Sequence, residues 1–121
     1  MMKEYQLTQA EQKLAEIIWD NAPISSSLLV ELCEKQLQWK KSTTYTMLKR
    51  LEGKGVFENR GSVVRALLTR EGFYAAQSKQ YVNRAFGGSL PRFLAAFTRN
   101  QKLSQQEIQE LKRLIDQHQG E

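Results

Sequence analysis

WKKSTTYTMLKRLEGKG, residues 39–55, is the stretch that decides the fold, because helical period, charge and side-chain chemistry coincide in it. On a helix of about 3.6 residues per turn, four positions at i, i+3, i+4 and i+7 form an inward stripe: Thr44, Met47, Leu48 and Leu51. The other face carries short hydrogen-bonding groups and cations: Ser42, Thr43, Thr46, Lys49 and Arg50. The pattern predicts a helix with one face on a core and the other offered to a polar partner.

The outward face suits the major groove of DNA. Cations and helix N-termini hold phosphates, whereas short hydrogen-bonding side chains reach base edges. We therefore assign base reading to three hydroxyl side chains: Ser42, Thr43 and Thr46. Contacts to the DNA backbone are assigned to the cations of the same stretch: Lys40, Lys41, Lys49 and Arg50. The alternative is an ordinary solvated surface helix.

Positive charge is concentrated in the middle of the chain, whose formal net charge is +5. Residues 40–70 hold eight Lys or Arg against two Asp or Glu, whereas residues 1–39 hold three against six. A basic segment of this kind is the electrostatic footprint of a nucleic-acid surface, although it would also attract an acidic protein. Two functions therefore remain, a DNA-binding protein and an interaction module for an acidic protein partner. The three hydroxyl groups favour DNA.

The composition limits the class of protein. A chain of 121 residues with 40% hydrophobic content is long enough for one packed domain, with or without an oligomerisation appendage. No apolar run approaches the roughly 20 residues of a membrane span, and no signal peptide is recognisable, so we expect a cytoplasmic protein without a membrane partner. The single cysteine, Cys33, excludes an internal disulfide and a cysteine-cluster metal site. Cys33 is assigned to the core, with a redox role as the alternative.

Catalysis finds little support in the sequence. His118 is the one histidine and lies near a polar C-terminus, no Gly-rich phosphate loop follows a predicted strand, and no residues are spaced as metal ligands. We therefore predict that the protein is not an enzyme, and we predict no cofactor and no metal.

Two further helices precede the opening stretch. Thr8–Glu11 forms a capping box that starts the first helix, and Asn21 and Pro23 end it. Its apolar face holds Ala10, Leu14, Ile17 and Ile18. Ser25 caps the second helix, whose predicted buried positions are Leu28, Leu29, Leu32 and Cys33. Trp39, in the turn that follows, is assigned to packing, with base stacking as the alternative.

A short hairpin follows the third helix, which Gly55 can end in the left-handed conformation. Beyond it the period changes to 2, and two strand-like runs, Val56–Arg60 and Val63–Leu68, are separated by Gly61-Ser62. A glycine in the first turn position predicts a type II′ turn. Arg60 then lies at the tip.

The register of this hairpin sets Glu58 opposite Arg65. We add Arg60 and Arg65 to the residues that contact the DNA backbone, with a cross-strand pair to Glu58 as the alternative for Arg65. Three helices and a hairpin form a winged helix-turn-helix, in which the third helix enters the groove and the wing lies on the backbone. The predicted fold is mainly α with a small β-hairpin, with a winged-helix DNA-binding domain over residues 1–70.

Residues 71–121 are predicted to be a helical dimerisation region. Glu71–Phe86 is the first helix, Gly87-Gly88 breaks it, Ser89 caps a short second helix, and Ser104–Glu107 is a capping box that opens the last. Three short helices cannot easily bury this much apolar surface among themselves, and a symmetric dimer would cover it. The predicted interface residues are Tyr81, Phe86, Leu90, Phe93, Leu94, Phe97, Ile108, Leu111 and Ile115. The alternative is a monomer in which these helices fold back on the first domain.

The pattern from Ser42-Thr43-Thr44-Tyr45-Thr46 through Leu48, Arg50-Leu51 and Lys54-Gly55 resembles the recognition helix of the penicillinase-repressor family. That family includes the β-lactam-resistance and copper-responsive repressors. The similarity continues over nearly the whole chain, in Leu7–Trp19, Trp39, Arg65-Ala66-Leu67, Phe86–Ser89 and Lys102-Leu103-Ser104. The resemblance implies a cytoplasmic homodimer that binds a dyad-symmetric operator in double-stranded DNA and represses genes until a signal releases it.

Two departures from the family pattern concern that signal. In the β-lactam branch, release involves proteolysis at an Asn-Phe bond, and the matching position here is Ala96-Phe97. The copper branch carries a C-terminal cysteine cluster, which this sequence lacks. The inducer or protease that would release this protein therefore stays unidentified.

Overall fold

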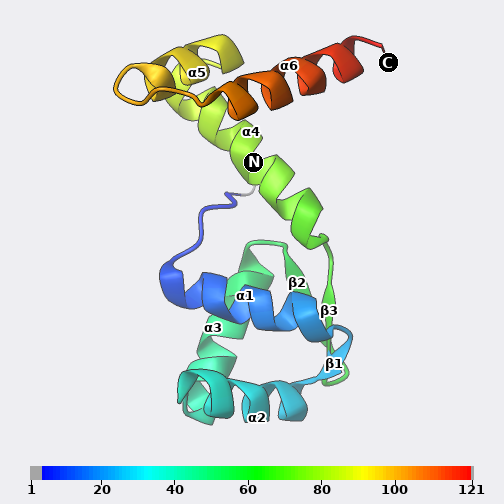
Figure 1. Ribbon diagram of the computed structural model, residues 1–121. Helices are drawn as coiled ribbons and strands as arrows, with labels where there is room; N and C mark the ends of the chain where they lie inside the picture. The colour runs from blue at the N-terminus through cyan, green and yellow to red at the C-terminus, as the bar shows by residue number, and fades with distance from the viewer. Residues whose placement is uncertain (1–3, 121) are drawn as a thin grey trace. The chain divides into compact units, whose positions relative to one another are not determined.

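The computed structural model describes residues 4–120, and within them it forms six helices and three short strands (Figure 1). In chain order these elements are α1 (Gln9–Asn21), β1 (Ile24–Ser25), α2 (Ser26–Leu37), α3 (Lys41–Gly53), β2 (Phe57–Arg60), β3 (Val63–Ala66), α4 (Arg70–Phe86), α5 (Leu90–Thr98) and α6 (Gln105–Gln119). The chain divides into two compact units, one extending to Tyr81 and the other beginning at Val82. Their boundary falls inside α4.

Helix α1 begins at the predicted capping box. The Thr8 hydroxyl accepts a hydrogen bond from the Glu11 backbone N–H at 3.1 Å, and the Glu11 carboxylate accepts one from the Thr8 N–H at 2.8 Å. Two N–H groups that have no helical partner are thereby satisfied. The helix ends at Asn21 as predicted, and its buried apolar residues are Leu14, Ala15, Ile17 and Ile18.

Helix α2 begins at its predicted cap, because the Ser25 hydroxyl accepts a hydrogen bond from the Leu28 N–H at 3.2 Å. Leu29 and Cys33 are fully buried, which confirms Cys33 as a core residue. The assignment of Leu28 to the core is wrong, since 46% of it is exposed. Each residue turns a helix by about 100°, so Leu28 points away from the stripe that Leu29 and Cys33 form.

Helix α3 buries the predicted stripe, with Thr44, Leu48 and Leu51 inside and Met47 partly covered. Gly55 follows its end with a φ of +76°. The Gly55 N–H donates to the Glu52 carbonyl at 3.0 Å and the Val56 N–H to the Leu51 carbonyl at 3.4 Å. These two bonds form a Schellman motif, and they confirm that Gly55 terminates the helix.

Strands β2 and β3 pair in the predicted register, with Glu58 opposite Arg65 and Arg60 opposite Val63. The predicted turn type is wrong. Gly61 and Ser62 both have positive φ, +59° and +61°, which is the pattern of a type I′ turn and not of a type II′ turn. The Ser62 carbonyl accepts a hydrogen bond from the Ser26 N–H at 2.9 Å, a contact with α2 that the turn sequence does not reveal.

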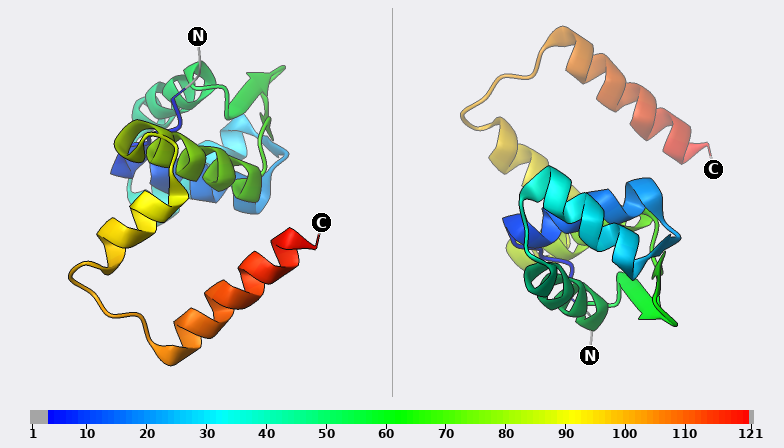
Figure 2. Two further views of the ribbon diagram at one scale, coloured as in Figure 1. Left: turned by 90° about the horizontal axis from the view of Figure 1, so that it is seen from above. Right: turned by 90° about the horizontal axis from the view of Figure 1, so that it is seen from below.

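A third strand, β1, was missed by sequence analysis. Ile24 and Ser25 pair with Val64 and Val63, so the sheet has the order β1-β3-β2. Two residues are too few to display an alternating pattern, and Ser25 carried the stronger signal of a helix cap. With three helices beside this sheet, the first unit is a winged helix, which Figure 2 shows from two further directions.

The core of the first unit includes a residue from α4. Phe73 is fully buried, and its ring lies 5.6 Å from that of Tyr5 and 5.3 Å from that of Trp19, centroid to centroid. Trp19 also contacts Phe57, at 5.3 Å. The sequence pattern assigns this part of α4 to the C-terminal region, and Phe73 is not among the residues predicted from it. Trp39 is partly buried against the same core, as the packing assignment predicts.

The second unit contains the predicted caps and breaks. Gly87 and Gly88 have φ values of +58° and +81° and separate α4 from α5, which the Ser89 hydroxyl caps. Ser104 and Glu107 form the capping box of α6. Neither α5 nor α6 has a fully buried residue.

Candidate nucleic-acid interface

The outward face of α3 carries the predicted base-reading and cationic residues. Ser42, Thr46, Lys49 and Arg50 are exposed, whereas Thr43 is half-buried. Thr43 is therefore less accessible than sequence analysis supposed. Since these residues span little more than two turns, one groove-sized surface presents both hydroxyl groups and cations.

The N-terminus of α3 is open. Lys40 occupies the N-cap position without a side-chain hydrogen bond to the helix, so the first N–H groups are not capped by that residue. The Lys41 ammonium lies 6.0 Å from the centroid of the Tyr45 ring, at the outer limit of a cation–π contact. Lys40 and Lys41 are both exposed beside this end, where an anion is electrostatically favoured.

The wing contributes two exposed cations, Arg60 on β2 and Arg65 on β3. Glu58 is opposite Arg65 in the ladder, and within residues 4–120 the two side chains form no ion pair. The cross-strand pair weighed for Arg65 is therefore not formed, which leaves its guanidinium available to an outside anion.

Glu52 ties the wing to α3, a contact that sequence analysis missed. Its carboxylate accepts a hydrogen bond from the backbone N–H of Asn59 on β2 at 3.1 Å. On the other side of α3, the Tyr45 hydroxyl donates to the hydroxyl of Ser26 at 3.3 Å. These contacts fix the face of α3 relative to the wing and α2. An acidic residue inside a strongly basic helix was the available signal for Glu52.

Lys54 belongs to the basic segment, residues 40–70, but its charge is paired within the first unit. Its ammonium lies 2.9 Å from the carboxylate of Glu11, which is 2% exposed, and donates to the Gln6 carbonyl at 2.8 Å. Burial alone would raise the pKa of Glu11, but hydrogen bonds from Thr8 and Lys54 outweigh it and lower the pKa. Lys54 is therefore a structural cation.

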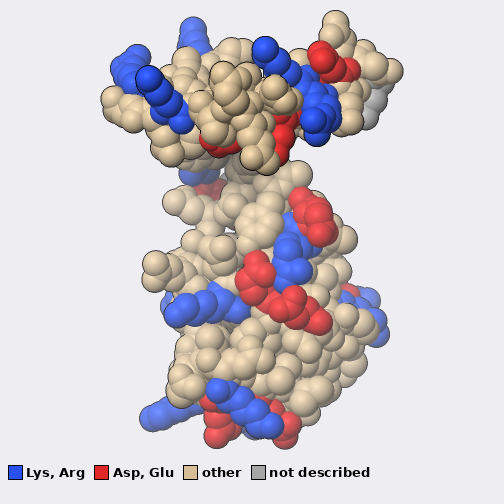
Figure 3. Space-filling view, in the orientation of Figure 1, with Lys and Arg blue, Asp and Glu red and all other residues tan. Residues whose placement is uncertain are grey.

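The charge of Arg70 is likewise balanced by carboxylates of the first unit. Its guanidinium contacts Glu16 at 2.8 Å and Asp20 at 2.6 Å and lies 5.6 Å from the Trp19 ring centroid. The hydrogen bond to Asp20, followed by the pairing with Glu16, raises the pKa of Arg70. Figure 3 shows acidic and basic side chains side by side over α1. After Lys54 and Arg70 are set aside, the cations left in residues 40–70 are the six assigned to DNA: Lys40, Lys41, Lys49, Arg50, Arg60 and Arg65.

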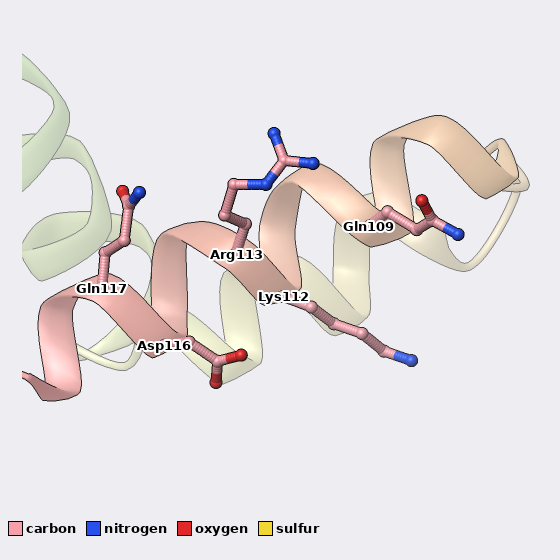
Figure 4. Close-up of a pocket in the computed structure, with 5 residues that line it drawn as sticks. All are labelled: Gln109, Lys112, Arg113, Asp116 and Gln117. Carbon is pink, nitrogen blue, oxygen red and sulfur yellow. The ribbon is translucent and has the colours of Figure 1, made fainter.

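Two hollows in the described part of the second unit offer no comparable set of groups, and one of them is lined mainly by apolar side chains of α5 and α6. A shallow hollow along α6 is lined by five residues of that one helix, and their side chains diverge from one another (Figure 4). Within residues 4–120, no cluster of three or more His, Cys, Asp or Glu side chains could hold a metal ion. The described helices are also too short or too polar to cross a membrane.

The fold and the basic face of α3 define the class of winged-helix DNA-binding transcription regulators. The chain matches the penicillinase repressor family over residues 7–117, and it belongs to that family. It is 29% identical to the penicillinase repressor of Bacillus licheniformis, over 98% of this chain and 95% of that protein. It is 26% identical to the methicillin resistance regulatory protein MecI of Staphylococcus aureus (strain N315), over 94% and 96% of the two chains.

Family membership confirms the resemblance found in the sequence. As a member of the penicillinase repressor family, the protein is a transcriptional repressor and not an enzyme.

Proposed function

We propose that this protein is a sequence-specific DNA-binding repressor that acts as a homodimer on a dyad-symmetric operator. The observation that carries the proposal is the exposed face of α3, where Ser42 and Thr46 lie among cations beside an uncapped helix N-terminus. Phosphate contacts give affinity and register, and base-edge contacts give specificity, so a reader of DNA needs both kinds of group on one surface. The names of the relatives support repression.

In the proposed complex, α3 enters the major groove. Ser42, Thr43 and Thr46 read bases, and the half-buried Thr43 does so only where the helix inserts deeply. Lys40, Lys41, Lys49 and Arg50 hold phosphates around the groove. Arg60 and Arg65 place the wing along the neighbouring backbone.

The second unit, together with Tyr81 at the end of the first, supplies the proposed dimer interface. Four of the assigned residues expose about half or more of their surface: Tyr81 at 55%, Leu90 at 63%, Phe97 at 48% and Ile115 at 60%. The other five, Phe86, Phe93, Leu94, Ile108 and Leu111, are partly buried. Large apolar side chains exposed together mark an interface, and a second copy of α5 and α6 would cover them. We propose that the first unit binds DNA and that the second dimerises.

The signal that releases the repressor is left open by this proposal. The bond Ala96-Phe97 lies within α5, and its residues differ from the Asn-Phe pair at which the β-lactam branch is cut. An unidentified inducer or protease would act on this cytoplasmic protein. An acidic protein partner is the competing function, and it would bind the same cations without using the hydroxyl groups of α3.

A footprint on the DNA upstream of the protein's own gene tests the proposal. We expect a protected segment with dyad symmetry, and titration of purified protein should show stronger binding to that segment than to a scrambled duplex at one fixed salt concentration. Lys40→Ala or Arg60→Ala should weaken binding to both duplexes and reduce the salt slope by about two per dimer. Equal affinity for both duplexes would contradict sequence-specific binding, and tight binding to an acidic protein would then favour the competing function.

A further inference from the structure

The Thr46 hydroxyl has a fixed hydrogen-bond polarity in this fold. Its oxygen lies 2.9 Å from the backbone carbonyl oxygen of Ser42, one turn earlier in α3. A carbonyl oxygen has no hydrogen, so the hydroxyl must donate, and it has a single hydrogen to give. Thr46 is exposed, and it therefore presents to an outside partner oxygen lone pairs and a methyl group but no donor.

Ser42 provides a contrast on the same face. Its hydroxyl makes no hydrogen bond within the described part of the chain, so it can either donate or accept. Thr46 does not have that choice. Turning the Thr46 side chain to donate outward would break its bond to the Ser42 carbonyl, and a net hydrogen bond corresponds to about fivefold in an equilibrium constant.

The major groove distinguishes donors from acceptors atom by atom. Adenine N6 and cytosine N4 carry amino groups that donate, whereas purine N7, guanine O6 and thymine O4 accept, and thymine adds a methyl group. An oxygen without a free hydrogen pairs with an amino group and is mismatched against any of the acceptors.

We infer that Thr46 is a specificity-determining acceptor, which takes a hydrogen bond from the amino group of an adenine or cytosine and offers its methyl to a neighbouring thymine. The inference rests on the proposed function, because it requires α3 to enter the major groove. It adds the direction of the hydrogen bond to the base. Thr46 accepts this bond, because its own hydrogen is donated to the Ser42 carbonyl.

The contacted base pair is found first. Operators are selected from a random duplex pool with the wild-type protein, with Thr46→Val and with Thr46→Ser. Valine replaces the hydroxyl by a methyl of similar size, whereas serine keeps the acceptor and removes the methyl. The base pair whose preference changes with Thr46→Val is the one that residue 46 faces, and thermal unfolding shows that each variant is folded.

Duplexes that lack a single hydrogen-bonding group at that base pair then show whether Thr46 accepts or donates. Purine in place of adenine, or 2-pyrimidinone in place of cytosine, removes the amino group, and a 7-deaza purine removes the N7 acceptor. We expect loss of the amino group to weaken the wild type and Thr46→Ser about fivefold and to leave Thr46→Val unaffected. Loss of N7 should weaken all three proteins equally, or none of them.

Three results would overturn the inference. Coupling between residue 46 and N7 would show that Thr46 donates, and an unchanged selection with Thr46→Val would show that it contacts no base. Both leave the proposed function standing, because the wild type still selects an operator. A wild-type protein that selects no sequence overturns the proposed function and this inference with it.

Discussion

The two units of this chain differ in how much apolar surface they bury. Within residues 4–120, every fully buried apolar side chain belongs to the first unit, from Leu14 to Phe73. The second unit has none, although it holds large apolar side chains such as Leu90, Phe97, Leu114 and Ile115, which are 48% to 63% exposed. The first unit carries its own core, whereas the second has the amphipathic pattern of a core and lacks the surface that would complete it.

The physical reason is the number of elements that meet. In the first unit, α1, α3 and the sheet pack together, and Phe73 on α4 completes an aromatic cluster around Trp19. A second unit made of the end of α4, α5 and α6 has too few layers to enclose its apolar faces. Stability should therefore reside in the first unit and assembly in the second.

Truncation after Tyr81 should have the largest effect on function. We expect a folded, monomeric first unit whose operator affinity is lower by a factor of about 10² to 10⁴, because linked heads make the second contact intramolecular. Sedimentation and operator titration measure the two changes. Truncation after Arg70 should instead fail to fold, since it removes Phe73. Full-length protein that stays monomeric at micromolar concentration would contradict the division of roles.

Substitution of one phenylalanine in each unit tests this difference directly. Phe73→Ala should lower the free energy of unfolding of the first unit by about 3–5 kcal/mol, because it leaves a cavity in a closed core. Phe97→Ala, at a 48% exposed position, should change that stability by less than about 0.5 kcal/mol and weaken self-association. Urea unfolding followed by the tryptophan signal, together with sedimentation, measures both. Similar effects of the two variants on the free energy of unfolding would contradict the conclusion that the closed core lies in the first unit.

The buried carboxylate of Glu11 should make the first unit sensitive to acid. Its pKa in the folded protein lies below the ordinary value of 4.5, so its stabilising contribution is present above that pH and is lost as the pH falls through the folded pKa. Glu11→Gln should lower the free energy of unfolding by about 1–3 kcal/mol at neutral pH, since the charge-assisted bond from Lys54 is lost.

Urea unfolding of both proteins from about pH 7 to about pH 3 checks this prediction. The difference between wild type and Glu11→Gln should shrink as the pH falls, because the wild-type carboxylate becomes protonated. A difference that does not depend on pH would show that the ionised form of Glu11 is not what stabilises the first unit, since glutamine can keep the cap on Thr8.

The smallest expected effect is a gain in stability at Gly53. A Cβ at this position in the last turn of α3 meets nothing within 4 Å, so Gly53→Ala should raise the free energy of unfolding by about 0.5–1 kcal/mol. Gly55→Ala is the matched control and should lower it, because a φ of +76° disfavours any residue with a Cβ. Thermal unfolding measures both, and self-association should not change.

Features with a local cause were predictable from the sequence. The Thr8–Glu11 and Ser104–Glu107 capping boxes, the Ser25 cap and the Gly55 terminus each depend on atoms within a few residues. The hairpin register was predictable for the same reason, because two strands joined by a two-residue turn must pair around it. Along α3, period alone separated the buried stripe from the outward hydroxyl groups and cations.

Features with a distant cause were missed. The pairing of β1 with β3, the left-handed Ser62 held against Ser26, and the burial of Phe73 beside Trp19 all join segments far apart in the chain. The contacts of Lys54 with Glu11 and of Arg70 with Glu16 span 43 and 54 residues. A count of charges along the sequence includes Lys54 and Arg70 in the basic segment, because the count does not show that carboxylates elsewhere in the chain pair with them.

The sequence by itself determined the family, the order of the elements, the ends of the helices and the set of outward residues on α3, because these follow from local propensity and period. The tertiary structure alone decided which cations remain available for DNA and how far the core of the first unit extends into α4. It also decided to which atom the Thr46 hydroxyl donates its hydrogen. Ion pairs and core contacts depend on distances across the fold, and the direction of a hydrogen bond depends on where its acceptor lies.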